Sequence, residues 1–207
     1  VNFSADEDTT NNLGIAQITV TGGGGSNSGN IVVNEIMYDP PSGDNEWVEL
    51  FNPGDSVINL KNWKLQDGTT TQHTITTTDY FLQPDSFVVL SASNAIFIYH
   101  PNLSQSRVIV MSSFPGLNNT GDAVIIYKLN GIVSDRVDYI DSWGGGGVSL
   151  ERIDISRPSN DSSNWGSSLD CEKSTPARVN SITSAVRYQK GDLVLNEIMA
   201  GPQTNEA

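Results

Sequence analysis

The chain has 207 residues, of which 37% are hydrophobic, and its four Trp, six Tyr and six Phe suffice for a packed core, which argues against disorder of the whole chain. Eleven Lys and Arg against 24 Asp and Glu give a net charge of −13, which argues against nucleic-acid binding because phosphate neutralisation needs a clustered basic surface. No apolar run reaches the ~18 residues of a membrane span, so the sequence predicts no transmembrane segment.

Residues 1–30 precede the main domain. The sequence begins VNFSADED, without an initiator Met or a basic and then apolar leader, so we expect a segment of a longer protein. GIAQITVT at 14–21 alternates apolar and polar residues, which predicts one strand. We interpret residues 1–21 as the last strand of a preceding domain; a native N-terminal strand of the main domain is the alternative. GGGGSNSGN at 22–30 has the composition of a flexible linker.

From residue 31 onward, short apolar or alternating runs are separated by turn residues. Asn130-Gly131 predicts a two-residue hairpin turn, because Asn and Gly accept the positive φ of a type I′ turn. Residues 93–102 predict the one short helix, which Pro101 ends. The expected strands cover residues 31–38, 46–52, 57–60, 62–67, 71–75, 87–91, 107–111, 123–129, 132–140 and 148–155. Many short strands with little helix predict an all-β fold, an antiparallel β-sandwich.

The opening strand is repeated near the end of the chain. VVNEIMYDP at 32–40 and VLNEIMAGP at 194–202 match at most positions. We therefore place one β-sandwich domain at 31–181, a linker at 182–192, and the first strand of a truncated second copy at 193–207. This last strand would lack its own sheet, and we expect it to pair with GIAQITVT, with an exposed sheet edge or with a neighbouring molecule.

Nine short motifs follow one another between about residue 31 and residue 181. They are NEI at 34–36, EWVEL-N at 46–52, L-x-x-W-x-L-x-D at 60–67, the apolar strand after LQP at 82–84, LNNTGDAVIIY at 117–127, VDYI at 137–140, SLER at 149–152, the segment around Trp165, and TP at 175–176 followed by Asn180. In order and spacing they resemble the lamin tail domain of the prokaryotic secreted type. The resemblance implies an immunoglobulin-like β-sandwich, and the repeated strand then marks the start of a second copy.

The resemblance also implies a function. Prokaryotic lamin tail domains commonly accompany extracellular nucleases, phosphatases and adhesive or sugar-binding modules, so we expect a non-catalytic structural or interaction module of a larger secreted or cell-surface protein. Its expected partners are flanking domains of the same chain, another protein or a cell-surface glycan. One alternative is an accessory domain that helps a neighbouring nuclease or phosphatase hold its substrate, which the net charge of −13 disfavours. Another is a calcium-stabilised adhesion module. A nuclear-lamin role is not expected, because no heptad rod or basic targeting segment precedes the domain.

Polar side chains interrupt the apolar strands in the NEI and EWVEL-N motifs. One interpretation is that Glu35 and Glu49 face solvent at alternating strand positions, where water satisfies them. The other is that Asn34 and Asn52 brace neighbouring loops through side-chain to backbone hydrogen bonds. The large residues expected to pack in or around the core are Trp47, Trp63, Trp165 and the pair Thr175-Pro176.

No combination of residues predicts catalysis. His73 and His100 belong to no recognisable motif, and the glycine run 144–147 lacks the Lys and Ser or Thr of a phosphate loop. The single Cys171 forms no internal disulfide, and flanking acidic residues disfavour its thiolate. One Cys with two remote His does not supply a zinc site. We therefore expect no catalytic residue and no cofactor other than calcium.

Calcium is the one cation that the composition suggests, because hard cations favour carboxylates and carbonyls gathered in loops. The candidate ligands are Asp39, Asp44 and Glu46 around the first turn, Asp138 and Asp141 further along, and residues 6–8 near the start. None of them follows the spacing of an EF-hand. Simple solvated acidic loops are the alternative interpretation.

Overall fold

The structure is a computed structural model that describes residues 29–183. The predicted last strand of a preceding domain and the repeated strand at 193–207 lie outside the described residues and stay predictions. The same holds for nearly all of both predicted linkers.

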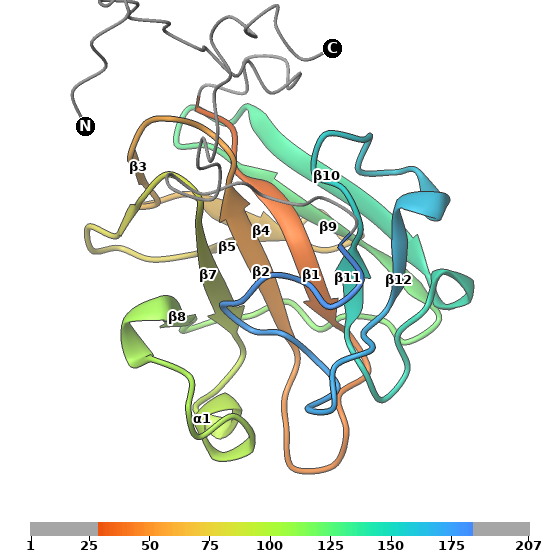
Figure 1. Ribbon diagram of the computed structural model, residues 1–207. Helices are drawn as coiled ribbons and strands as arrows, with labels where there is room; N and C mark the ends of the chain where they lie inside the picture. The colour runs from red at the N-terminus through yellow and green to blue at the C-terminus, as the bar shows by residue number, and fades with distance from the viewer. Residues whose placement is uncertain (1–28, 184–207) are drawn as a thin grey trace, which may run out of the picture.

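Six strands form the larger sheet (Figure 1). Their spatial order is β12 (Trp165–Ser167), β11 (Leu150–Arg152), β1 (Val32–Met37), β2 (Trp47–Asn52), β7 (Ser86–Ser91) and β8 (Val108–Val110). Neighbouring strands are antiparallel except β7 and β8, which run parallel. The sequence predicted all of these strands except the three-residue β12.

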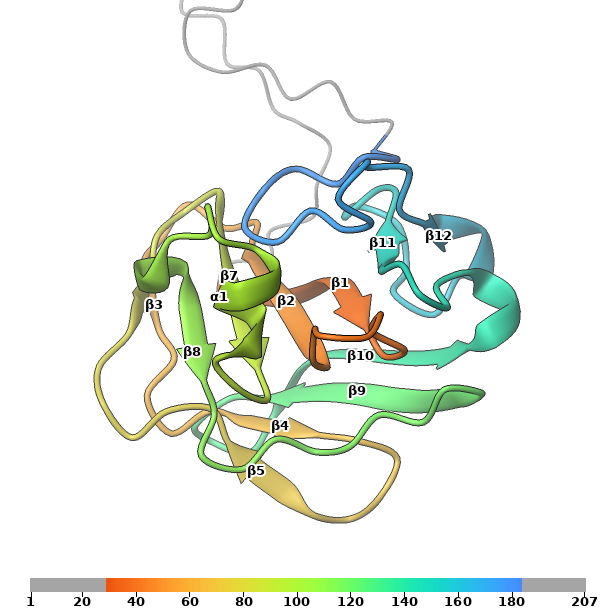
Figure 2. The same cartoon turned by 90° about the horizontal axis from the view of Figure 1, so that it is seen from below.

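The smaller sheet has the order β10 (Val133–Ile140), β9 (Gly121–Tyr127), β4 (Lys64–Gln66) and β5 (Gln72–Thr74). Two further strands, β3 (Ile58–Asn59) and β6 (Phe81–Leu82), pair with each other. Figure 2 shows β10, β9, β4 and β5 as a layer beneath β1, β2 and β7. This arrangement confirms the predicted all-β, immunoglobulin-like sandwich.

The predicted helix is present, and the predicted hairpin is present with a different turn. Lys128 N donates to the Ile132 carbonyl, so the loop between β9 and β10 has three residues, Leu129, Asn130 and Gly131. Gly131 has a φ of 78° but the φ of Asn130 is not positive, so the predicted two-residue type I′ turn is wrong. The helix α1 (Ala95–Tyr99) ends before Pro101. Single 3-10 turns complete the helical elements: η1 (Gln105–Arg107), η2 (Asp141–Trp143) and η3 (Ser162–Asn164). Within residues 29–183, no helix has both the length and the apolar character needed to cross a bilayer.

Side chains alternate between the two faces of each strand, and the apolar side chains on the facing sides of the two sheets form the core between them. On β2, Val48 and Leu50 belong to one apolar cluster with Val124 and Ile126 of β9. All four side chains are 0% exposed, and full burial of such a side chain stabilises the fold by about 1.5–3 kcal/mol. The predicted core residue Trp63 joins the same cluster.

The outer face of the larger sheet is buried as well. Trp47 packs there with Ile96 of α1, and Phe51 packs with Phe87 at the opposite end of the strands. Residues 168–183, which we call the strap, follow β12 and cross this face, drawn in blue in Figure 1. The larger sheet is therefore the middle layer of the molecule.

The prediction that Glu35 and Glu49 face solvent is wrong. Both side chains point to the outer face, yet both are 0% exposed. The physical reason is the strap, which covers the position where water was expected. Strand alternation assigns a side chain to a face of the sheet, but it does not tell whether that face is solvated.

The glycine run 144–147 lets the β10–β11 connection pass close to the sheet. A Cβ added to Gly145 would lie 2.5 Å from Tyr38 Cε1, and one added to Gly144 would lie 2.6 Å from Ser167 N. The Tyr38 hydroxyl donates a hydrogen bond to the Gly144 carbonyl at 2.5 Å. Close packing against Tyr38 and β12 thus explains Gly144 and Gly145.

Candidate functional site

Three glutamates form a row across the outer face of the larger sheet. Glu35 on β1 lies directly opposite Glu49 on β2 and Glu151 on β11, and all three side chains are 0% exposed. A bulge in β1 also brings Asn34 to this face, where its Nδ2 donates to Glu49 Oε1 at 2.9 Å. Like charges at directly opposed positions destabilise a sheet. We call these three glutamates the carboxylate row.

The strap supplies backbone donors to two members of the row. Thr175 N donates to Glu35 Oε1 at 2.8 Å, and Ala177 N donates to Glu49 Oε2 at 2.5 Å. Glu35 Oε1 also accepts a hydrogen bond from the Ser149 hydroxyl at 2.5 Å. Each carboxyl is thereby hydrogen-bonded although water has no access, as buried polar groups must be.

The third member, Glu151, shares the Thr175 hydroxyl with Glu35. Its Oε2 accepts hydrogen bonds from Ser181 Oγ at 2.7 Å and from Ile182 N at 3.1 Å. The Thr175 hydroxyl lies 3.0 Å from Glu151 Oε1 and also 3.0 Å from Glu35 Oε2. A hydroxyl has one hydrogen and can donate to only one of them. The other contact is a hydrogen bond if that carboxyl is protonated and donates to the hydroxyl oxygen.

The electrostatics agree with this geometry. Burial raises the pKa of Glu35 from 4.5 to about 7, although its hydrogen bonds from Ser149 and Thr175 act in the opposite direction. Burial and then the charge of Glu35 raise the pKa of Glu49 well above its usual value. Within residues 29–183, no Lys, Arg or His nitrogen forms an ion pair with any member of the row. The row is therefore uncompensated when it is ionised.

The predicted bracing role of asparagine is confirmed for Asn52. Its Nδ2 donates to the backbone oxygens of Ser56 and Leu82, at 2.9 and 3.1 Å. Asn34 acts instead through the strap: its Nδ2 donates to Asn180 Oδ1 at 2.8 Å, and Asn180 Nδ2 donates back to the Asn34 carbonyl at 2.9 Å. This pair fixes the far end of the strap to β1.

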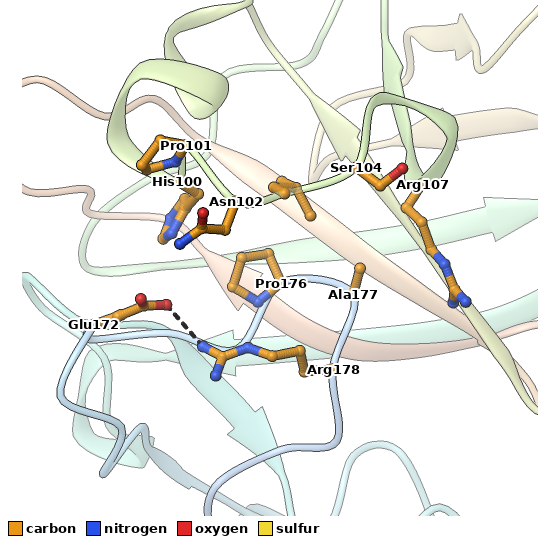
Figure 3. A pocket seen from close by; sticks show the side chains of 10 residues that line it. His100, Pro101, Asn102, Ser104, Arg107, Glu172, Pro176, Ala177 and Arg178 are labelled. Carbon is orange, nitrogen blue, oxygen red and sulfur yellow. Dashed lines mark hydrogen bonds and ion pairs between the residues drawn. The ribbon is translucent and has the colours of Figure 1, made fainter.

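A groove of about 380 Å³ opens between the strap and the segment that joins α1 to β8 (Figure 3). Residues between His100 and Arg107 form one wall, and the strap residues Glu172, Pro176, Ala177 and Arg178 form the other. Because Thr175 and Ala177 bind the carboxylate row, the row holds one wall of this groove in place. We call it the strap groove.

The two arginines of the strap groove differ in their partners. Arg178 is ion-paired with Glu172 at 3.0 Å and with Asp170 at 3.5 Å. Arg107 is exposed, and its guanidinium forms no hydrogen bond or ion pair with any residue that the structure describes. Arg107 is thus a free cation beside the apolar surface of Leu103 and Pro176.

Asp44, His100 and Ser174 come together behind the groove, but not as a catalytic triad. His100 Nε2 lies 3.6 Å from Asp44 Oδ2 and 3.4 Å from Ser174 Oγ. A triad places the carboxylate at one ring nitrogen and the hydroxyl at the other, whereas here both contact the same nitrogen. Ser174 is also 0% exposed, so its hydroxyl is not available to a substrate.

The sequence prediction missed Glu151, the strap as a covering segment, and Arg107. A signal for the row was present: NEI, VEL and LER each place one glutamate within an apolar strand. One glutamate within each of three apolar strands would indicate that the three side chains lie together in one polar layer. No comparable signal marks Arg107, because a groove between two loops has no sequence period.

The calcium candidates do not gather into one site. The candidates within the described residues are Asp39, Asp44, Glu46, Asp138 and Asp141; residues 6–8 lie outside them. Among residues 29–183, no three His, Cys, Asp or Glu side chains form a group that could hold a metal ion. Asp138 accepts hydrogen bonds from Arg136 at 2.6 and 2.9 Å, and Asp44 lies beside His100.

Thermal unfolding tests the calcium prediction. Because these carboxylates lie apart and several already have partners, we expect the same Tm in chelator and in millimolar Ca²⁺. A Tm that rises and saturates with Ca²⁺, but not with Mg²⁺, would contradict this expectation and would favour the calcium-stabilised adhesion module. Differential scanning calorimetry on the full chain measures the difference.

The family model described as Lamin Tail Domain matches residues 25–141, which is more than half of the chain. No curated protein matches the sequence. The match includes Glu35 and Glu49 but ends before β11, β12 and the strap.

Proposed function

Because the chain belongs to the lamin tail domain family, we propose that it is a non-catalytic interaction module of a larger secreted or cell-surface protein, of the prokaryotic secreted type. The likeness between residues 32–40 and 194–202 supports a second copy of the domain in the same protein. Arrays of β-sandwiches are typical of such surface proteins. The Asp44, His100 and Ser174 geometry gives no support to an enzymatic role.

The observation that carries the proposal is the strap groove with its free Arg107. A guanidinium without a partner, next to apolar surface, suits a protein segment that presents a carboxylate beside an apolar side chain. The groove lining contains no Trp, Tyr or Phe on which a sugar ring could stack. We therefore favour a protein partner, which includes a flanking domain of the same chain, over a cell-surface glycan.

The accessory role beside a nuclease or phosphatase has weaker support. One free arginine does not make the clustered basic surface that phosphates need, and the net charge of −13 repels them. A gel-shift titration at low salt tests this alternative. Affinity for single-stranded or duplex DNA that falls steeply with added salt would favour the accessory role over the protein-binding role.

A pair of model peptides tests the protein-binding role. One peptide alternates Leu and Glu, and its matched control alternates Leu and Lys. In an NMR titration of the full chain, we expect the Leu/Glu peptide to shift amide signals of residues 100–107 and 172–178, and the Leu/Lys peptide to leave them unchanged. The charge of Arg107 is the reason, because its wall carries no compensating carboxylate.

Arg107→Gln should weaken binding of the Leu/Glu peptide about tenfold or more, since a hydrogen bond to a charged group is worth about 1.5–3 kcal/mol. Arg136→Gln is the matched control, because the exposed Arg136 on β10 already forms an ion pair with Asp138. Equal shifts with both peptides, or equal affinity in both variants, would refute a role for the strap groove.

A further inference from the structure

We propose that the strap is a proton-dependent latch: the carboxylate row holds it closed over the larger sheet while Glu35 is protonated, and ionisation of Glu35 releases it. The proposal goes beyond the protein-binding role and does not require that the strap groove bind a ligand. It concerns the equilibrium between a closed and an open strap, with the two sheets intact in both.

Five hydrogen-bond donors of the strap bind the row. They are Thr175 N, Thr175 Oγ1, Ala177 N, Ser181 Oγ and Ile182 N. Residues 168–183 contain no strand, so they add no ladder of backbone bonds to either sheet. Further attachments are the bonds of Asn180 to Asn34 and to the Arg152 carbonyl. The strap is also hydrogen-bonded along β11: Ser149 N donates to the Lys173 carbonyl, Ser168 N to the Ser149 carbonyl, and the Thr183 hydroxyl to the Ile153 carbonyl.

No positive charge on the surrounding elements compensates the row. On β11, the Arg152 guanidinium is directed to the Val33 carbonyl and to Asp135 of β10. On the strap, Arg178 is paired with acidic neighbours, and Lys173 forms no ion pair with any described residue. Behind the strap, His100 lies beside Asp44 and Ser174 rather than beside the row.

Opening of the strap is the simplest way to hydrate an ionised row. The sheet itself can stay paired, because β1, β2 and β11 keep their backbone ladder when the cover leaves. In the closed state each ionised carboxyl would lack both water and a cation, which is costly. With the pKa of Glu35 at about 7 in the closed state, the change falls near neutral pH.

Hydrogen exchange measured by NMR on the full chain tests the latch. Protection factors, corrected for the intrinsic effect of pH, are compared for the amides of Thr175, Ala177 and Ile182 and for amides of β9. We expect strap protection to fall about thirtyfold between pH 5.5 and pH 8, because opening returns the pKa of Glu35 from about 7 towards 4.5 and about 1.5 pH units of that interval lie above pH 5.5. Protection of β9 should stay high throughout.

Two substitutions make the test specific. Glu35→Gln mimics the protonated acid, because its amide can donate to the Thr175 hydroxyl, so strap protection should no longer depend strongly on pH. Asp55→Asn, at an exposed carboxyl away from the strap, is the control and should keep the wild-type response. Strap protection in the wild type that is equal at both pH values, or that falls only together with β9, would overturn the latch.

Discussion

Arg152→Met should lower the free energy of unfolding by about 3–5 kcal/mol, the cost of leaving a buried charge without its partner. The side chains of Arg152 and Asp135 are only 2% and 10% exposed, and they meet at 3.3 Å. The guanidinium also donates to the carbonyls of Val33 and Arg157, at 3.1 and 2.7 Å. Methionine keeps most of the side-chain volume but satisfies none of these acceptors. Urea denaturation near neutral pH measures the loss.

The control for this substitution is Arg136→Met. Arg136 and Asp138 are about half exposed, and an exposed ion pair contributes less than about 1 kcal/mol. Adding Asp135→Asn to Arg152→Met should recover part of the stability, because it removes the unpaired charge. An equal loss of unfolding free energy for Arg152→Met and Arg136→Met would show that the buried Arg152–Asp135 pair stabilises the fold no more than an exposed pair does.

The free energy of unfolding should fall by ~3 kcal/mol as the pH rises from 4.5 to 8. Folding raises the pKa of Glu35 from 4.5 to about 7, and each unit corresponds to about 1.4 kcal/mol. A carboxyl with a raised pKa binds its proton more tightly in the folded state. Its stabilising effect is thus complete below pH 4.5 and is lost as the pH rises through about 7. The raised pKa of Glu49 acts in the same direction.

Urea midpoints measured at half-unit pH intervals check this dependence. Carboxyls with a lowered pKa, such as Asp138 and Asp154, oppose it only in more acidic solution, near and below their usual value of 3.8. Glu35→Gln should flatten the curve and make the variant more stable than the wild type at pH 8. A wild-type stability that is constant or rises between pH 5 and pH 8 would contradict the account of the row.

Much of the fold could be predicted from local signals. The β9–β10 hairpin at Asn130-Gly131 and the alternation along β2 and β10 each depend on neighbours within a few residues. Trp47 and Trp63 were predicted to pack in the core, and both are buried. These elements are decided by turn chemistry and strand period, which a single sequence displays directly.

The candidate site could not be predicted in the same way. Glu35 is satisfied by Thr175, a residue 140 positions later in the chain, and the strap that carries Thr175 has no periodic pattern. The sequence placed Glu35 and Glu49 on the outer face correctly, but solvent was assumed to cover that face. The strap groove likewise depends on two loops that meet only in the folded chain.

The position of β1 has a consequence for synthesis and folding. β1 is translated before the other strands of the domain, and its neighbour β11 and the donors of the strap follow more than 100 residues later. Until then one edge of β1 is an open template for wrong strand pairing. Glu35 and Glu49 are ionised at neutral pH in the unfolded chain, and charges within apolar strands oppose aggregation. Glu35 and Glu49, which destabilise the folded domain above neutral pH, therefore protect the nascent chain from aggregation until β11 is translated.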